Sequence, residues 1–234
     1  MTPVAKFYKS VDVREENGEW SVRLDGRPLK SPQRTQLAVP NRALAEAIAE
    51  EWRAQNKTLD PASMPLTRLA FAARDVASAH RTRLEEEILG FGRTDLLCYR
   101  ADAPAALVAR QAESWDPLLA WAADRLGAKL GVGSGIAYVE QSPESQAALA
   151  AAVKGRDTFA LVALHGATAI TGSVVLGLAL LEGRLNAADA FALSRLDERF
   201  QNEAWGTDAE AEARALRLGG ELAAIEHFLE LLRP

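Results

Sequence analysis

Asn17-Gly-Glu-Trp-Ser-Val-Arg-Leu-Asp-Gly26 decides the fold class of the amino-terminal part of this chain. Between the two glycine dipeptides, Trp20, Val22 and Leu24 alternate with polar residues, which is the period of a strand with one buried face. Asn-Gly and Asp-Gly favour the positive backbone angles of tight hairpin turns. The stretch therefore predicts an antiparallel β-meander over about residues 7–30.

A helix is expected to complete this small unit. A further short strand is predicted at residues 36–39. Pro40-Asn41 then opens an alanine-rich helix that runs to about Gln55, with Leu44 and Ile48 on one face. We interpret residues 1–62 as a small α+β domain with β-hairpins.

The rest of the chain, residues 63–234, is predicted to be a larger all-α helical domain. Apolar residues recur at helical spacing from Pro65 onward, and Ser142-Pro143 supplies a cap and a first-turn proline. A last helix from Asp208 is expected to place Leu222 and Ile225 in the core. The fold class is therefore α+β, a small meander plus helix followed by a helical domain.

An uncharged segment, residues 159–181, has the length of a membrane span. Its many small and polar residues weaken apolar transfer and suit close helix packing. We expect a core helix, broken near Thr171-Gly172-Ser173, and no insertion into a membrane.

Composition excludes several classes of partner. The formal net charge is -5 and the pI is near 5.4, so nucleic acid and anionic membranes, which require a basic face, are not expected partners. The single cysteine, Cys98, rules out an intramolecular disulfide and suggests a reducing compartment. The amino terminus lacks the pattern of a secretory or organellar leader, so a cytoplasmic location is expected.

The candidate motifs for catalysis or cofactor binding do not have the required residue spacing. Gly131-Val-Gly-Ser-Gly135 has its glycines in the wrong register for a nucleophile elbow or a dinucleotide loop, and there is no Walker loop. None of the three histidines has a glutamate at the offset of a carboxylate-bridged metal site. We predict no metal, no cofactor and no catalytic residue. His80 falls on an apolar helix face, where a hydrogen-bonded core imidazole is expected.

Residues 196–212, Leu-Asp-Glu-Arg-Phe-Gln-Asn-Glu-Ala-Trp-Gly-Thr-Asp-Ala-Glu-Ala-Glu, gather acids and one tryptophan around a helix break; we call this segment the acidic elbow. Helical spacing predicts that Leu193, Leu196, Phe200 and Ala204 share a buried face. Asp197 borders that stripe, so its charge must be paired. Trp205-Gly206 should end the helix, and Thr207-Asp-Ala-Glu210 has capping-box spacing for the next one.

The acidic elbow is the predicted protein-binding surface, because tryptophan is a frequent interface anchor. Helix capping and solubility are the alternative explanation of its acids. A second contact region is predicted after the second hairpin turn, where the alternative is a proline-bearing edge strand with solvated charges. The candidate partner-binding residues are Asp197, Glu198, Glu203, Trp205, Asp208 and Glu210 in the elbow, and Arg27, Pro28 and Lys30 after the turn.

Several segments together resemble the alpha-subunit assembly chaperone family of F-type ATP synthase, over nearly the whole chain. They are, in order, residues 24–32 (Leu-Asp-Gly-Arg-Pro-Leu-Lys-Ser-Pro), 49–52 (Ala-Glu-Glu-Trp), 64–69 (Met-Pro-Leu-Thr-Arg-Leu), 94–100 (Thr-Asp-Leu-Leu-Cys-Tyr-Arg), 115–121 (Trp-Asp-Pro-Leu-Leu-Ala-Trp), 171–173 (Thr-Gly-Ser), 197–201 (Asp-Glu-Arg-Phe-Gln) and 205–208 (Trp-Gly-Thr-Asp).

The resemblance implies a bacterial, cytoplasmic chaperone that binds the unassembled alpha subunit and prevents its aggregation before the catalytic hexamer forms. It implies no catalysis and no nucleotide requirement. An arginine, Arg68, Arg93 or Arg100, is expected to neutralise Asp197. Two other classes stay open: an enzyme that uses the acids of residues 197–210, and a helical carrier in which residues 159–181 line a cavity for a small ligand.

Overall fold

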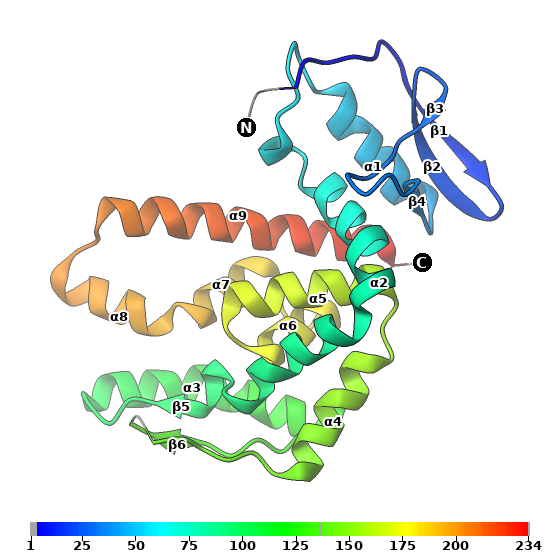
Figure 1. Cartoon of the computed structure of the whole chain (residues 1–234). Helices are drawn as coiled ribbons and strands as arrows, with labels where there is room; N and C mark the ends of the chain where they lie inside the picture. Colours follow the sequence, from blue (N-terminus) through cyan, green and yellow to red (C-terminus); the bar gives the residue numbers. More distant parts are fainter. Residues whose placement is uncertain (1–3, 136, 234) are drawn as a thin grey trace. The chain divides into compact units, whose positions relative to one another are not determined.

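The computed structural model describes residues 4–135 and 137–233, with the side chains of all but residues 76–79. The chain divides into two compact units (Figure 1). The first comprises residues 1–81, 158–163 and 227–234, and the second comprises residues 82–157 and 164–226. Each unit is described by itself.

A small antiparallel sheet and one helix form most of the first unit. Its elements are β1 (Val11–Glu16), β2 (Glu19–Leu24), β3 (Arg27–Pro28), β4 (Ala38–Val39), α1 (Arg42–Arg53) and the first part of α2 (Pro65–Arg93). β2 pairs with β1, β3 and β4. The left-handed backbones of Asn17-Gly18 and Asp25-Gly26 make the two turns, so the predicted meander is confirmed.

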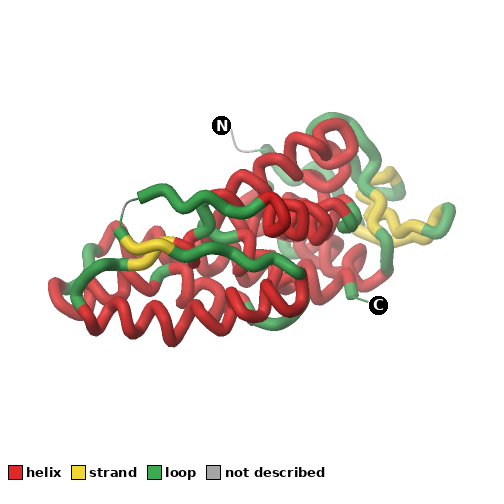
Figure 2. Tube along the Cα trace, turned by 90° about the horizontal axis from the view of Figure 1, so that it is seen from below, coloured by secondary structure: helices red, strands yellow, loops and turns green. Residues whose placement is uncertain are grey.

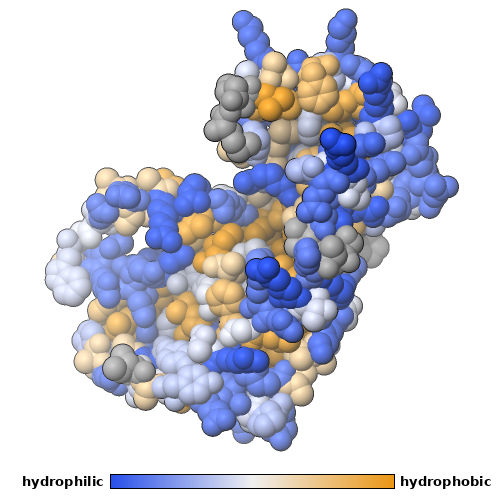
Figure 3. All heavy atoms as spheres, in the orientation of Figure 1, coloured by the Kyte–Doolittle hydropathy of each residue, from blue (hydrophilic) through white to orange (hydrophobic). Residues whose placement is uncertain are grey.

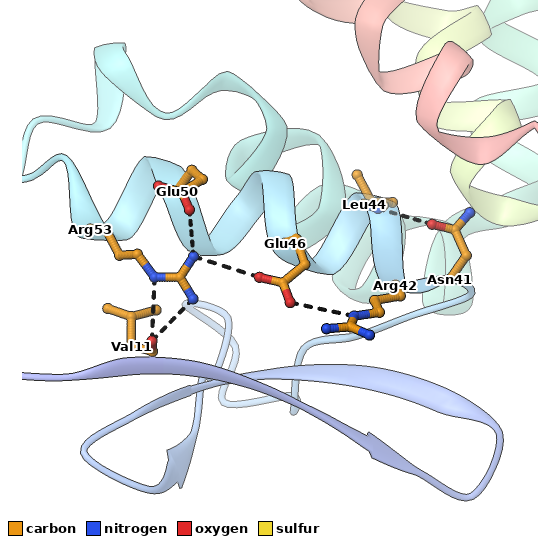
Figure 4. A network of polar contacts seen from close by, with 7 residues as sticks. All are labelled: Val11, Asn41, Arg42, Leu44, Glu46, Glu50 and Arg53. Atoms are coloured by element: carbon orange, nitrogen blue, oxygen red, sulfur yellow. Dashed lines mark hydrogen bonds and ion pairs between the residues drawn. The ribbon is translucent and has the colours of Figure 1, made fainter.

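Helix α1 begins where the sequence predicts, because the Asn41 side chain accepts a hydrogen bond from the amide of Leu44 at 2.9 Å. Arg53, at its other end, bonds Glu50 at 2.6 Å and donates to the Val11 carbonyl at 3.2 Å (Figure 4). These polar contacts tie the exposed side of α1 to the first strand. Its apolar face, with Leu44 and Ile48, is fully buried.

The second unit is mainly helical. After the end of α2 it contains β5 (Tyr99–Arg100), α3 (Ala105–Trp121) with a π-helical turn at Ala122–Leu126, β6 (Gly133–Ser134), α4 (Pro143–Lys154), α5 (Thr158–Thr171) from residue 164, α6 (Val174–Leu181), α7 (Ala187–Ser194), α8 (Leu196–Trp205) and α9 (Ala209–Leu232) to residue 226. β5 and β6 pair in parallel, a ladder that the sequence patterns do not predict (Figure 2).

The uncharged segment forms α5 and α6, and the helix breaks at Gly172, as predicted. Gly172 has a φ of 70°, and the Ser173 side chain caps α6 through the amide of Leu176. All of α6 from Val174 to Leu180 is buried. No helix in the described part of the chain is long and apolar enough to cross a membrane.

Two local predictions are wrong. His80 is exposed, since it lies at a kink in α2 where its backbone leaves the helical region (φ -134°, ψ 28°). The predicted buried stripe over residues 193–204 is interrupted, because the helix breaks at Arg195 between α7 and α8. Leu196 is buried, Leu193 and Phe200 are half-buried, and Ala204 is exposed.

We expect Gly177→Ala to lower the free energy of unfolding by about 1–3 kcal/mol, although alanine is the better helix former. An added Cβ would lie 2.6 Å from Thr168 Oγ1 and 3.1 Å from Leu164 Cδ1, inside the core. Urea unfolding followed by circular dichroism measures the change. Gly220→Ala is the matched control, since nothing lies within 4 Å of its Cβ. Equal stability of the two variants would contradict tight packing of α5 on α6.

Candidate partner-binding site

The acidic elbow projects from the second unit as a solvent-exposed corner between α8 and α9 (Figure 1). Helix α8 ends at Trp205, and Gly206 follows with a φ of 83° that favours glycine. Residues 201–214 are all exposed, and the Trp205 side chain is 83% exposed. A tryptophan this exposed leaves a large apolar area in water, which is typical of an interaction site.

The start of α9 differs by one residue from the predicted capping box. Helix α9 begins at Ala209, and the Asp208 carboxylate accepts a hydrogen bond from the amide of Ala211 at 3.1 Å. Asp208, not Thr207, is therefore the cap, because its side chain reaches the free amide of the first turn. Glu210 is exposed in that turn, where negative charge meets the positive end of the helix dipole.

Asp197 is half-buried and is held by an amide rather than by an arginine. Its Oδ1 accepts a hydrogen bond from Gln111 Nε2 at 2.7 Å, and Gln111 Oε1 accepts from the amide of Ala101 at 2.8 Å. Gln111 is completely buried. The expected neutralisation by an arginine is therefore wrong; of the three named, Arg100 pairs instead with Asp116.

The other two acids of α8 form ion pairs. Glu198 pairs with Arg195 at 3.0 Å, and Glu203 pairs with Arg110 of α3 at 2.7 Å. The hydrogen bond from Arg110 holds the pKa of the Glu203 carboxyl below its usual value. Arg110 also lies over the Phe200 ring, 5.1 Å from its centroid. Glu203 thus helps to fix α8 on α3, and its lowered pKa does not suit a proton donor at neutral pH.

The second predicted contact region lies in the other unit. Arg27 and Pro28 form β3, which pairs with β2, and the backbone of Lys30 forms an isolated antiparallel β-bridge with Gln36. Arg27 and Lys30 are exposed and Pro28 is half-buried. This geometry is that of the proline-bearing strand named as the alternative, and it leaves both basic side chains available to solvent.

Residues that the site prediction missed include Asp95, which joins two of the quoted motifs. Its completely buried carboxylate accepts hydrogen bonds from the Ser173 hydroxyl at 2.7 Å and from the amides of Leu97 at 3.0 Å and Val175 at 3.1 Å. Asp95 therefore caps α6 from a segment almost 80 residues earlier in the chain. The sequence signal for this contact is that one quoted motif, residues 94–100, contains an acid and another, residues 171–173, contains hydroxyl side chains.

Two further pairs of motifs meet in the same way. The half-buried Glu51 accepts hydrogen bonds from the Thr67 hydroxyl at 2.6 Å and its amide at 2.8 Å, which caps α2 within the first unit. In the second unit Arg100 bonds Asp116 at 2.8 Å and lies 5.2 Å from the Trp115 ring centroid. These motif residues brace each unit internally. Apart from the elbow and the hairpin, the quoted motifs thus carry structural contacts.

We expect the contribution of Asp95 to stability to depend on pH. Burial raises the pKa of its carboxyl to about 6, above the ordinary 3.8, although the hydrogen bonds from Ser173, Leu97 and Val175 lower it. Since the folded-state pKa is the higher one, the folded protein holds the proton more tightly. This contribution is fully present below about pH 4 and is lost as the pH rises through about 6.

The measurement is urea unfolding of the parent protein and of Asp95→Asn, which cannot titrate, at pH 5, 6 and 7. The stability of the parent relative to the variant should fall from pH 5 to pH 7. A difference that stays constant over this range would show that the carboxyl is not perturbed by burial.

A metal centre finds no support in the described residues, because no group of three histidine, cysteine, aspartate or glutamate side chains is placed to hold an ion. The Cys98 thiol is fully buried, and burial raises its pKa to about 12. Such a thiol is a packing residue rather than a nucleophile.

Known proteins are similar to this chain over both of its units. The family model of the ATP12 chaperone protein matches residues 5–123. Protein atp12, mitochondrial, of Schizosaccharomyces pombe is 28% identical over 214 residues, which cover 86% of this chain and 74% of that protein. The crystal structure of Atp12 from Paracoccus denitrificans is 46% identical, with a TM-score of 0.94 and coverage of 98% of this chain and 99% of that chain. A mutant of the Paracoccus protein has a TM-score of 0.94, 45% identity and 98% coverage of both chains.

Proposed function

Because the chain belongs to the ATP12 chaperone protein family, we propose that it binds the unassembled alpha subunit of its own F-type ATP synthase. It thereby prevents the alpha subunit from aggregating before the catalytic hexamer forms. The single observation that carries the proposed site is the exposed Trp205 at the acidic elbow. An unassembled subunit exposes apolar surface that its neighbours will later cover, and an exposed indole can cover part of it meanwhile.

Within the elbow the acids divide into two groups. The first group is proposed to contact the client directly, together with the exposed Trp205; it consists of the exposed acids Glu198, Asp208 and Glu210. Asp197 and Glu203 are proposed to act mainly by holding α8 on α3, through Gln111 and Arg110. Carboxylates at the rim of an interface contribute more to steering and orientation than to affinity.

Arg27, Pro28 and Lys30 are proposed as a second contact region, because two basic side chains stand exposed beside a hairpin turn. The chaperone is proposed to need no nucleotide. It is proposed to act in the bacterial cytoplasm, since the similar solved structures come from the bacterium Paracoccus denitrificans. Residues 1–62 remain the proposed amino-terminal domain.

The enzyme alternative would require at least two strongly perturbed acids that converge in a cleft. In the acidic elbow the hydrogen bond from Arg110 lowers the pKa of the Glu203 carboxyl, which is the opposite of what a proton donor needs. The carrier alternative would require residues 159–181 to line a cavity. Instead Thr168 and Leu164 lie against Gly177, which favours a filled core. We therefore propose no catalytic activity and no small ligand.

The test is aggregation of purified alpha subunit at the temperature where it aggregates alone, followed by light scattering. An equimolar amount of this protein should suppress the scattering, whereas the same amount of serum albumin should not. If the alpha subunit aggregates equally in both, the proposed function is wrong.

A further inference from the structure

We propose that the groove between α9 and the α7–α8 pair binds an amphipathic helix of the client, about two turns long, with its amino-terminal end near Gly206. The inference rests on the proposed function and names what the site holds. The groove has a volume of about 1090 Å³ and lies wholly in the second unit. A two-turn helix, about 10 Å wide and 11 Å long, occupies roughly 900 Å³.

Small residues leave room for a helix on both walls. On α7 the groove is lined by Ala188 and Ala192, which are four residues apart, and on α9 by Ala211 and Ala215, with the same spacing. Phe191 and Leu218 provide larger apolar surface. Each wall thus presents one helical stripe of short apolar side chains, which permits close approach of a third helix. Hydrophobic residues lie among hydrophilic ones on the face of this unit that the space-filling view shows (Figure 3).

A helical occupant suits these walls better than an extended one. An extended peptide that binds by strand addition needs a free sheet edge, and both walls of the groove are helices. A helix satisfies its own backbone and presents only side chains. The apolar residues of the occupant at positions i, i+3, i+4 and i+7 would face the alanine stripes.

Charge sets the direction of the bound helix. Asp208, Glu210 and Glu212 line the groove near Gly206, where α8 ends and α9 begins. Farther from Gly206 along each helix, Arg199 on α8 and Arg214 on α9 also line it, and neither forms an ion pair with any described residue. The positive amino-terminal end of a helix dipole fits the acids, and the negative carboxyl-terminal end, or an acidic last turn, fits the two arginines.

The first arm of the test fills the groove. Ala211 is exposed, so Ala211→Trp should leave the fold intact. Because Ala211 lines the groove, the added ring should weaken binding of purified alpha subunit at least 10-fold. Leu216→Trp is the matched control, because Leu216 lies on the same helix, is 74% exposed and does not line the groove. A second comparison tests the charges. The double variant Arg199→Glu/Arg214→Glu should weaken binding of the alpha subunit. Arg184→Glu, at an exposed position outside the groove, should leave that binding unchanged.

The second arm identifies the occupant. The native thiol of Cys98 is buried, so Ala211→Cys and Ala188→Cys each provide a single accessible thiol for a photo-crosslinker. Both should cross-link one helical segment of the alpha subunit, Ala211→Cys near its amino-terminal end and Ala188→Cys about two turns later.

The outcomes are distinguishable. If the parent protein binds the alpha subunit and Ala211→Trp binds as well as Leu216→Trp, the groove inference is wrong and the proposed function stands. Cross-links to an extended segment, or to scattered sites, overturn the helical occupant. If the parent protein does not bind the alpha subunit at all, both proposals fail.

Discussion

An Asp95→Ala variant is expected to lose about 2–4 kcal/mol of its free energy of unfolding. The substitution leaves the Ser173 hydroxyl and the amides of Leu97 and Val175 buried without their acceptor. Each orphaned donor costs about 1–3 kcal/mol. Relief from burying a charge offsets part of the sum, since burial is what raises the pKa of this carboxyl.

Equilibrium urea unfolding at pH 7 measures this loss. Glu113→Ala is the matched control, because that carboxylate is exposed on α3 in the same unit. Exposed substitutions of this kind usually stay within about 0.5 kcal/mol. A loss no greater than that of the control would mean that the contact between residues 94–100 and 171–173 does not stabilise the second unit.

A Trp205→Ala variant is expected to bind the alpha subunit about 30-fold more weakly, with an unchanged free energy of unfolding. Truncating a tryptophan at the centre of an interface typically costs about 2 kcal/mol or more of binding free energy, which is roughly 30-fold in affinity. The side chain is 83% exposed, so its removal takes little from the fold. Biolayer interferometry with purified alpha subunit measures the affinity, and urea unfolding checks the fold.

The control is Tyr138→Ala, which removes another exposed aromatic ring, 64% exposed, on a different loop of the second unit. Its affinity should match that of the parent protein. If the tryptophan and tyrosine variants bind equally well, the acidic elbow is not the contact surface.

Local signals in the sequence predicted most of the fold. The hairpin turns at Asn17-Gly18 and Asp25-Gly26 need positive φ angles, which few residues adopt, so the pattern of residues there is specific. The Asn41 and Ser142 caps are similarly local, because donor and acceptor lie three residues apart. The break at Gly172 follows from its left-handed backbone.

Errors arose where two local solutions were close in energy or where the partner is distant in sequence. Thr207 and Asp208 can both cap α9, and one position separates them. The partners of Asp197 and Glu203 lie 86 and 93 residues away, so spacing carried no information on Gln111 or Arg110. The β5–β6 ladder also joins distant residues, in strands of only two residues each. The division of the chain at residue 62 stays a prediction.

The most direct test is a capture experiment. The tagged protein is mixed with equimolar purified alpha and beta subunits of the ATP synthase from the same organism, and the subunits that it retains are identified. The alpha subunit should be retained and the beta subunit should not, and addition of free alpha subunit should displace the captured alpha subunit. Retention of neither subunit, or equal retention of both, would contradict the claim that this chaperone holds the alpha subunit before assembly.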